Sequence, residues 1–407
     1  MTGAVAGAAK PVDPTGVGST MRLADASILA ALLLASTLTV MAGAVFVPVL
    51  ELVRRDLGLS ATQTGLVLTA HGLSVAAASP LAGRLIDGWG PRIPLVGGLT
   101  LYAAAGGAGL VVESYPALIA ARLAFGVGAA AVFVGTTTAL IGLYSGRLRD
   151  RVMGWRSSAI SLGGLAWPLL GGALGTLSWQ APSSLYLLGA PLAIAVLLTL
   201  PASASSAGPP GDRGSTWALL RSSRRLVLLL SVQTIAAILL YVVLAFVPLR
   251  LAELDVSGPV TVALCPAALS LAMTLAGLAF ATARLRLGIS ALLLLALLKW
   301  SASLASIALA SEPALIVAGA ALFGLGMGLA VPALTLAVGE ATPVRLRGRA
   351  ISLLAVATFA GQFAAPLLAG PVVETTSVAG GFMVFAAVAA VAFGSGLLAR
   401  LRGVARA

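Results

Sequence analysis

Long apolar runs separated by short polar segments dominate the pattern of residues along the chain. A run of roughly 20 apolar residues is long enough to cross the hydrocarbon core of a bilayer as an α-helix. Such runs predict spanning helices near residues 27–50, 60–82, 93–112, 117–141, 154–178, 182–200, 226–249, 259–281, 288–310, 313–338, 350–373 and 380–399. We therefore expect an all-α membrane protein with twelve transmembrane helices, six in each half of the chain.

The two halves of the chain repeat each other at a shift of 198 residues. Between 147–172 and 345–370, 11 of 26 positions are identical, and both stretches begin with Arg-Leu-Arg-x-Arg. The same shift places Phe125-Gly-x-Gly128 on Phe323-Gly-x-Gly326. A repeat at about half the chain length indicates two similar structural units. We expect two pseudo-symmetric six-helix bundles, a design that in membranes supports alternating access.

Polar segments set the expected boundaries of these bundles. Residues 1–26 are small and polar and lack the basic-then-apolar order of a cleaved signal, which predicts a disordered tail. The N-terminal bundle covers 27–200 and the C-terminal bundle 226–400. Between them, 201–225 is rich in Pro, Ser and Gly and then basic, as expected of a linker. Residues 401–407 form a second tail.

Composition and charge placement support the membrane assignment. Hydrophobic residues make up 59% of the chain and charged residues 9%, against about 25% charged in soluble proteins. If the N-terminus is cytoplasmic, 20 of the 25 Lys and Arg residues fall on the cytoplasmic side and only Arg54, Arg55 and Arg250 on the other. The positive-inside rule then places both termini in the cytoplasm, with the chain in the inner or plasma membrane. The net charge of +12 is thus a topology signal, and no nucleic-acid partner is expected.

The sequence lacks the residues that several kinds of functional site need. His71 is the only histidine and Cys265 the only cysteine, so metal clusters and disulfides are not expected. Neither Lys10 nor Lys299 follows a phosphate-binding glycine loop. A membrane enzyme or receptor would need catalytic residues clustered at one membrane face, and we find none. We expect no enzyme activity, no cofactor and no metal.

The segment between the second and third spans reads Gly83-Arg-Leu-Ile-Asp87-Gly-Trp-Gly90-Pro-Arg92. It resembles the signature loop of the major facilitator superfamily, Gly-x-Leu-Ala-Asp-Arg-x-Gly-Arg-Lys/Arg, and stands at the same place in the chain. The resemblance covers almost everything after residue 26 and implies the major facilitator fold. Glycines at Gly83 and Gly90 would let helices approach and turn closely.

The resemblance implies a gating role for Asp87 in this loop. Its carboxylate would face the start of the eleventh span, near Arg347, Arg349 and Ser352, and join the halves on the cytoplasmic side when the transporter is open outward. Pro91 stands where the family usually has a basic residue, which leaves Arg92 as the candidate to replace it. The alternative is that the loop only determines topology.

The fourth span contains Arg122 followed by Gly126, which resembles the second motif of the family. In proton-coupled members the resemblance gives this arginine a role in coupling, and an ionisable residue inside the membrane is a functional candidate. Alternatively, Arg122 reaches outward to the interface or pairs with Glu113.

The fifth span contains Gly163-Gly-Leu-Ala-Trp167-Pro168-Leu-Leu-Gly171-Gly172, which resembles the antiporter motif of drug:proton exporters. Proline bends the helix and the glycines permit close packing. Trp167 replaces a glycine of that motif and could form an aromatic wall of the cavity. A kinked packing helix without any information on transport direction is the alternative.

Two further ionisable residues lie inside predicted spans. His71 in the second span can change charge near pH 6.5 and is a candidate for proton coupling, or else a neutral residue bonded to a neighbouring helix. Lys299 in the ninth span is either part of the cavity or a local structural contact. These candidates are the positions where the repeats differ, since Asp87, His71, Arg122 and Lys299 correspond to Leu285, Leu269, Ala320 and Leu101.

The family architecture implies a cavity between spans one, four, seven and ten, with spans two, five, eight and eleven between the halves. Polar or aromatic candidates for its wall are Thr39, Trp167, Lys299, Phe133, Thr137, Gln233, Tyr241, Phe323, Phe359 and Gln362. We expect a monomeric secondary transporter, surrounded by membrane lipids, that couples proton movement to export of amphipathic or apolar small molecules. The alternative is an organic-anion or metabolite transporter, in either direction, with an embedded basic site of Arg122, Lys299 and His71.

Overall fold

Helices form every regular element in the described part of the chain, which is residues 23–201, 221, 223–342 and 347–404 of a computed structural model. The first half contains α1 (Leu23–Ala44), η1 (Val47–Val49), α2 (Leu50–Asp56), α3 (Ala61–Trp89), α4 (Arg92–Gly107), η2 (Ala108–Leu110), α5 (Tyr115–Leu143), α6 (Gly146–Gly175), η3 (Ala181–Leu188) and α7 (Gly189–Thr199). The second half contains α9 (Arg224–Ala252), α10 (Pro259–Leu309), α11 (Pro313–Glu340), α12 (Arg347–Thr375) and α13 (Val378–Val404). The expected tail 1–26 and linker 201–225 lie largely outside the described ranges.

The described helices provide the predicted number of spans. Eleven of them, or pairs of them, are long and apolar enough to cross a membrane. The longest, Pro259–Leu309, has 51 residues, and Gly288 interrupts its helical conformation with φ 74° and ψ 164°. Division at Gly288 gives twelve spans and confirms the break that the sequence predicts between residues 281 and 288.

The internal repeat extends over the backbone of both halves. Helix α3 begins at Ala61 and α10 at Pro259, and α5 begins at Tyr115 and α11 at Pro313, each pair 198 residues apart. At the same shift, Gly90 and Gly288 both have φ 74° and end a span with the same turn. Only glycine adopts such a backbone without strain, which explains the residue at both positions.

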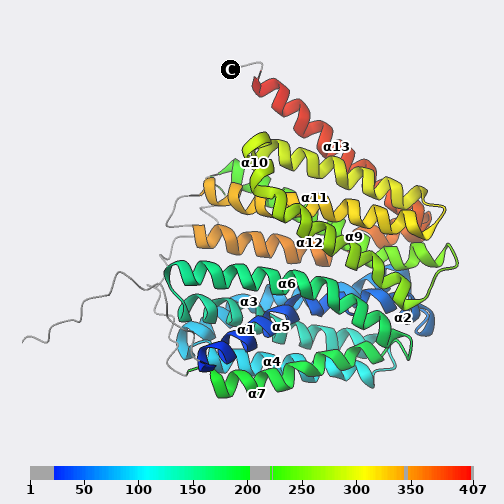
Figure 1. The fold of residues 1–407 in the computed structure, drawn as a ribbon. Helices are drawn as coiled ribbons and strands as arrows, with labels where there is room; N and C mark the ends of the chain where they lie inside the picture. Colours follow the sequence, from blue (N-terminus) through cyan, green and yellow to red (C-terminus); the bar gives the residue numbers. More distant parts are fainter. Residues whose placement is uncertain (1–22, 202–220, 222, 343–346, 405–407) are drawn as a thin grey trace, which may run out of the picture.

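The two halves lie side by side with their helices roughly parallel to one another (Figure 1). Helices α1–α7 form the lower bundle of the view and α9–α13 the upper one. Two helix pairs carry most of the packing between the halves, α3 against α12 and α6 against the first part of α10. These are the second, eleventh, fifth and eighth spans, as the family architecture implied.

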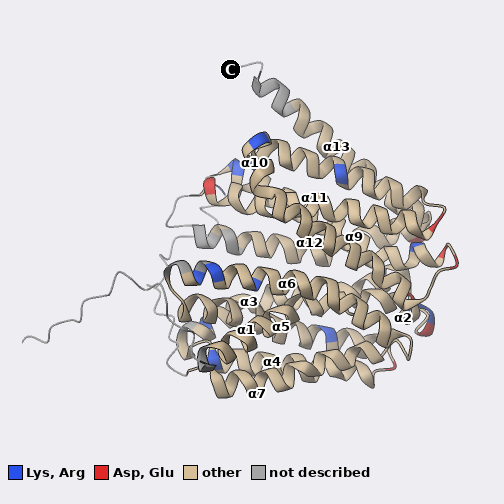
Figure 2. Cartoon of the chain, viewed as in Figure 1, with Lys and Arg blue, Asp and Glu red and all other residues tan. Residues whose placement is uncertain are grey.

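Charged side chains mark the two ends of the bundle (Figure 2). We call the end where α3 gives way to α4, and where α6 begins, the basic end, because Arg84, Arg92 and Arg149 belong to it. At the opposite, acidic end, Glu51 lies in the first turn of α2, Glu253 follows α9 directly, and Glu374 lies in the last turn of α12.

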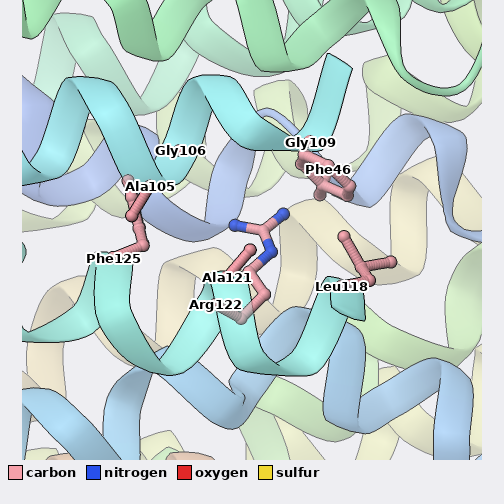
Figure 3. Close-up of a pocket in the computed structure, with 8 residues that line it drawn as sticks. All are labelled: Phe46, Ala105, Gly106, Gly109, Leu118, Ala121, Arg122 and Phe125. Carbon is pink, nitrogen blue, oxygen red and sulfur yellow. The ribbon is translucent and has the colours of Figure 1, made fainter. Parts of the chain in front are cut away.

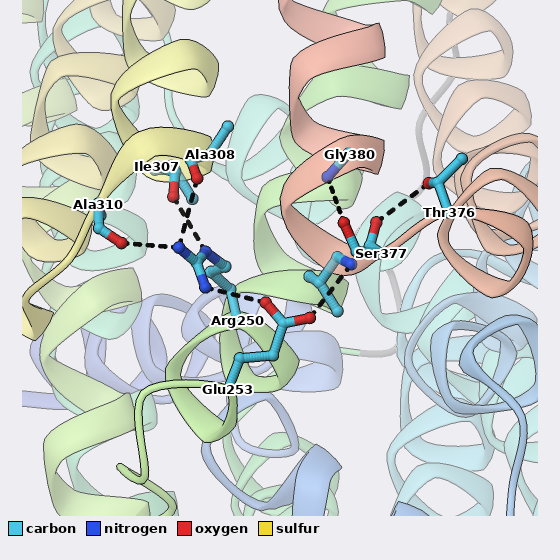
Figure 4. Close-up of polar contacts among 9 residues, drawn as sticks. Arg250, Glu253, Ile307, Ala308, Ala310, Thr376, Ser377 and Gly380 are labelled. Carbon is cyan, nitrogen blue, oxygen red and sulfur yellow. Dashed lines mark hydrogen bonds and ion pairs between the residues drawn. The ribbon is translucent and has the colours of Figure 1, made fainter.

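The arginines at the acidic end are all held by local acceptors. Glu51, which is 1% exposed, accepts hydrogen bonds from both Arg54 and Arg55 at 2.7 Å. Arg250 donates to Glu253 at 2.9 Å and to the last carbonyls of α10, including that of Ala310 at 2.7 Å (Figure 4). These three residues are the exceptions to the charge asymmetry of the sequence, and each is neutralised where it lies.

Candidate functional site

The halves contact each other closely at the acidic end, beside a hollow of about 430 Å³ that is lined by α2, α3, α9, α12 and α13. On the α3–α12 side, the backbone N–H of Thr62 donates to Glu374 at 2.9 Å, and Gly65 faces Pro366 so closely that a Cβ would collide with it. On the α6–α10 side, a Cβ on Gly172 would lie 2.7 Å from the carbonyl oxygen of Pro259. In the motif Pro168-Leu-Leu-Gly171-Gly172, Gly172 therefore admits the backbone of the other half, whereas Gly171 packs against Val45 of its own half.

Toward the basic end, α6 and α10 separate around a cavity of about 740 Å³. Its walls are mostly apolar with a few hydroxyls, and come from α6, α10 and α11: Ser157, Ser158, Ser161, Leu162, Leu165, Leu271, Met273, Thr274, Gly277, Leu278, Met327, Gly328, Val331 and Pro332. This volume and this mixture of surfaces are typical of sites for small molecules.

His71 connects the halves midway through the membrane region. Its Nε2 lies 3.3 Å from Nε2 of Gln362 in α12, and both side chains are buried. If the Gln362 amide donates this hydrogen bond, His71 accepts it and its ring is neutral. The other ring nitrogen, Nδ1, is buried without a hydrogen-bond partner among the described residues. The structure thus brings together His71 and Gln362, two residues that the sequence singled out separately.

Arg122 is buried inside the N-terminal bundle, with 4% of its surface exposed. Its Nη1 donates to the carbonyl oxygen of Ala42 at 3.2 Å and to the hydroxyl of Tyr186 at 3.1 Å. The guanidinium lies 3.7 Å from the centroid of the Phe46 ring, a cation–π contact. Neither alternative from the sequence applies, since Arg122 does not reach the surface and is in no ion pair among the described residues.

The remaining guanidinium nitrogen of Arg122 faces a small hollow. Nη2 is buried without a hydrogen-bond partner, and a cavity of about 10 Å³ adjoins the side chain. Figure 3 shows the guanidinium extending from α5 toward the helix that carries Gly106 and Gly109. A cavity of this size has room for about one water molecule. On the other side of this cluster, the ring of Phe125 lies between Arg122 and His71, with centroid distances of 5.7 and 5.9 Å.

Other cavity candidates meet at the interface nearer the basic end. Phe133 of α5 and Phe359 of α12 pack edge to face, with ring centroids 6.3 Å apart. Thr137 donates its hydroxyl to the carbonyl oxygen of Phe133 at 2.8 Å. Behind Phe359, Gln233 donates to the hydroxyl of Thr358 at 2.9 Å. These contacts place a mainly aromatic junction between the halves.

Some candidates lie elsewhere. Phe323 is fully buried and stacks on Trp300 at 5.7 Å, so the structure places it inside the C-terminal bundle and not on the cavity. The repeat explains this, because Phe323 corresponds to Phe125, which is also a core residue. Lys299 belongs to the part of α10 that packs on α11 and α13, in the half opposite to Arg122 and His71. The structure does not assemble these three cations into one site.

Trp167 and Tyr241 are partly buried in the described structure. The indole Nε1 of Trp167 is buried without a hydrogen-bond partner, close to the backbone of Gly163. Among the described residues, neither Trp167 nor Tyr241 makes a side-chain polar contact that supports a role in ligand binding.

Among the described residues of the signature loop, Arg92 makes a side-chain hydrogen bond. Arg92 donates through Nη2 to the carbonyl oxygen of Leu197 near the end of α7, so it holds α4 against α7 within one half. Gly83 has open space where a Cβ would point, whereas Gly90 makes the turn described above. The side chain of Asp87, and those of Arg347, Arg349 and Ser352, lie outside the described set, so the gating contact stays a prediction.

Comparison of the sequence with profiles of known protein families identifies the family of this chain. A profile described as Major Facilitator Superfamily matches residues 32–298, which is more than half of the chain. The chain belongs to the Major Facilitator Superfamily. This superfamily consists of membrane transporters, and eleven helices of the described residues are long and apolar enough to span a membrane.

Two curated relatives in this superfamily are drug-resistance proteins. Multidrug resistance protein 1 of Bacillus subtilis (strain 168) is 30% identical over 139 residues, 33% of this chain and 35% of that protein. Quinolone resistance protein NorA of Staphylococcus aureus is 28% identical over 136 residues, with the same two coverages. Each match spans about a third of the relative's own length.

Solved structures of superfamily members share the whole fold. The nucleoside transporter NupG superposes with a TM-score of 0.73 over 91% of this chain and 98% of that protein, at 16% sequence identity. At this identity the likeness concerns the fold alone, and it agrees with the two six-helix bundles expected from the repeat.

Proposed function

We propose that the protein is a proton-coupled exporter of amphipathic or apolar small molecules that works by alternating access. The observation that carries this proposal is the asymmetric interface. Helices α3 and α12, and α6 and α10, touch closely at the acidic end, whereas α6 and α10 separate around a cavity of about 740 Å³ toward the basic end. The largely apolar wall suits substrates that partition into lipid, and drug resistance is the named property of the two relatives.

The orientation of the bundle follows from charge. Lys and Arg concentrate at the basic end, whereas the three arginines of the acidic end are neutralised locally (Figure 2). By the positive-inside rule, the basic end and both termini are cytoplasmic. The cavity then opens inward, and the structure represents an inward-facing state that is ready to accept substrate from the cytoplasmic side.

Proton coupling is assigned to His71, with Arg122 as its electrostatic neighbour. A neutral His71 accepts from Gln362 and thereby ties α3 to α12 in the inward-facing state. A protonated imidazole has two N–H donors and no acceptor, so the contact in its present form is lost unless the Gln362 amide turns its oxygen toward the ring. Protonation would loosen the acidic-end closure and favour the outward-facing state, in which the proton is taken up and substrate released.

Closure of the cytoplasmic side is assigned to Asp87. In the outward-facing state its carboxylate would approach the start of α12, where the partial positive charge of a helix N-terminus favours an anion. Arg92, which binds the carbonyl of Leu197 in the present state, would hold α4 in place during this movement.

The deciding experiment is transport in proteoliposomes with and without an imposed pH gradient. A panel containing ethidium and neutral lipophilic compounds should accumulate against its own gradient when the inside of the vesicle is acidic relative to the outside and the basic end faces outward. Transport that ignores the pH gradient contradicts proton coupling, and no movement of any compound in the panel contradicts the substrate class.

A further inference from the structure

We propose that Arg156, together with Phe133 and Phe359, forms a binding site for the carboxylate of an aromatic organic anion. The site lies between the two halves, nearer the basic end than His71 and Gln362. It deepens the proposed function, on which it rests for the access of substrate between the halves, and it names a substrate class. Arg156 precedes two residues that line the cavity of about 740 Å³, Ser157 and Ser158, and none of the three site residues lines that cavity itself.

Arg156 has an unusual environment for a charged residue. It lies in α6 with its guanidinium carbon 5.9 Å from the centroid of the Phe133 ring. Its Nε and Nη2 atoms are buried, and neither has a hydrogen-bond partner in the described part of the chain. No ion pair of the described residues includes it. The guanidinium therefore has donors to offer that the protein itself does not use.

The fold does not require a charge at this position. Arg156 corresponds to Leu354 in the second copy of the repeat, and that leucine is buried in the C-terminal bundle. Burying hydrogen-bond donors of a cation without partners is costly, and more so within a membrane. A ligand that supplies the missing acceptors offsets this cost.

The two phenylalanines locate the site on the central surface. By the repeat, Phe133 corresponds to Val331 and Phe359 to Ser161, and both of these residues line the cavity of about 740 Å³. Phe133 and Phe359 therefore occupy the symmetry-related positions, and they contact each other across the interface. Phe133 lies ten residues before the end of α5 at Leu143, and Arg156 ten residues after the start of α6 at Gly146, so both are at the same depth.

The chemistry of these side chains selects the ligand. A guanidinium presents parallel N–H groups that match the two oxygens of a carboxylate. An edge-to-face phenylalanine pair suits an aromatic ring attached to that carboxylate. Every described acidic side chain lies at one end or the other of the bundle, so a bound anion meets no like charge at this level.

Equilibrium binding of cinnamate and of its neutral analogue cinnamamide to the purified full-length protein tests the site. We expect Arg156→Gln to weaken cinnamate binding by about 10–100-fold, the usual effect of losing a charged hydrogen bond, while cinnamamide changes by less than about twofold. Arg156→Lys should restore part of the affinity, since the charge remains but the paired donors do not. Phe133→Leu should weaken both probes equally.

Arg149→Gln is the matched control, because it removes the same charge from an exposed position of the same helix. If Arg149→Gln weakens cinnamate as much as Arg156→Gln does, the effect is general electrostatics and the site is refuted. Equal loss of both probes in Arg156→Gln, with a lowered melting temperature, assigns Arg156 a structural role and also refutes it. The binding measurement needs no pH gradient, so it is independent of the transport assay. If cinnamate binds through Arg156 but a pH gradient does not drive transport, that result contradicts the proposed function and leaves the binding site intact.

Discussion

The backbone N–H of Thr62, at the start of α3, donates a 2.9 Å hydrogen bond to the carboxylate of Glu374, at the end of α12. The contact joins the two halves at the acidic end and places a negative charge at a helix N-terminus, where it is favoured. The contact proposed between Asp87, near the end of α3, and the start of α12 is the counterpart of this hydrogen bond at the other end of the same two helices. A carboxylate at the end of each helix would then face the start of the other, and the two contacts would form in opposite states.

Replacement of Glu374 should therefore shift the protein toward the outward-facing state. A carboxylate at a helix N-terminus contributes about 0.3–1 kcal/mol, so Glu374→Ala should change the ratio of states by roughly two- to fivefold. The rate of maleimide labelling at Ala61→Cys, in a Cys265→Ser background, reports opening at the acidic end and should rise. Glu374→Gln, which keeps an acceptor oxygen, should have a smaller effect. An unchanged labelling rate in Glu374→Ala means that the contact does not hold the gate.

The approach of Gly65 to Pro366 yields a second prediction. A methyl group at Gly65 would collide with the proline ring, so Gly65→Ala should prevent full closure at the acidic end. We expect faster labelling of Ala61→Cys and loss of inward-facing substrate binding, with little change in melting temperature because the collision exists in only one state. Gly97→Ala in α4, where a Cβ meets nothing within 4 Å, is the control. Equal labelling in the two variants would contradict the assigned closure.

The fold was predictable because its signals are long and repeated. Twelve apolar runs and a constant shift of 198 residues specify two bundles, and the turn at Gly288 appears where the copy of Gly90 requires it. The position of Phe323 was harder to predict from the sequence, because aromatic residues occur both in cores and in cavities. The alignment of Phe323 with Phe125 does not decide between core and cavity, because the neighbouring spans that bury both residues appear only in the structure.

The partners of embedded charges could not be predicted from sequence. Arg122 is satisfied by a backbone carbonyl and by Tyr186, which lies in another span, and no local pattern announces either. Arg156 is one of the 20 basic residues counted on the cytoplasmic side, although the predicted fifth span, 154–178, contains it. Its mismatch with Leu354 in the repeat was the available signal, the same one that singled out His71 and Arg122.

Arg250 should be important for stability and not for coupling. Its guanidinium closes the end of α10 by binding the carbonyls of Ile307, Ala308 and Ala310, and Glu253 relays the contact to the backbone N–H of Val378 (Figure 4). Loss of such charged hydrogen bonds costs about 1–3 kcal/mol, so Arg250→Ala should lower the melting temperature by several degrees. Arg55→Ala, whose arginine is half exposed in its ion pair with Glu51, should have little effect. Comparable losses in both variants would contradict this ranking.

Substitution of His71 separates coupling from substrate binding. In His71→Gln the amide can still bond to Gln362 across the interface, so α3 and α12 keep their contact, but the side chain no longer titrates. We expect bound substrate to exchange across the membrane while an imposed pH gradient no longer drives accumulation. His71→Leu, which copies the residue of the second repeat at position 269, loses both the hydrogen bond and the titration, and should also label faster at Ala61→Cys. The measurement is counterflow beside gradient-driven uptake in the same proteoliposomes. If His71→Gln retains full gradient-driven transport, the coupling proton resides on another group, because no amide can carry it at physiological pH.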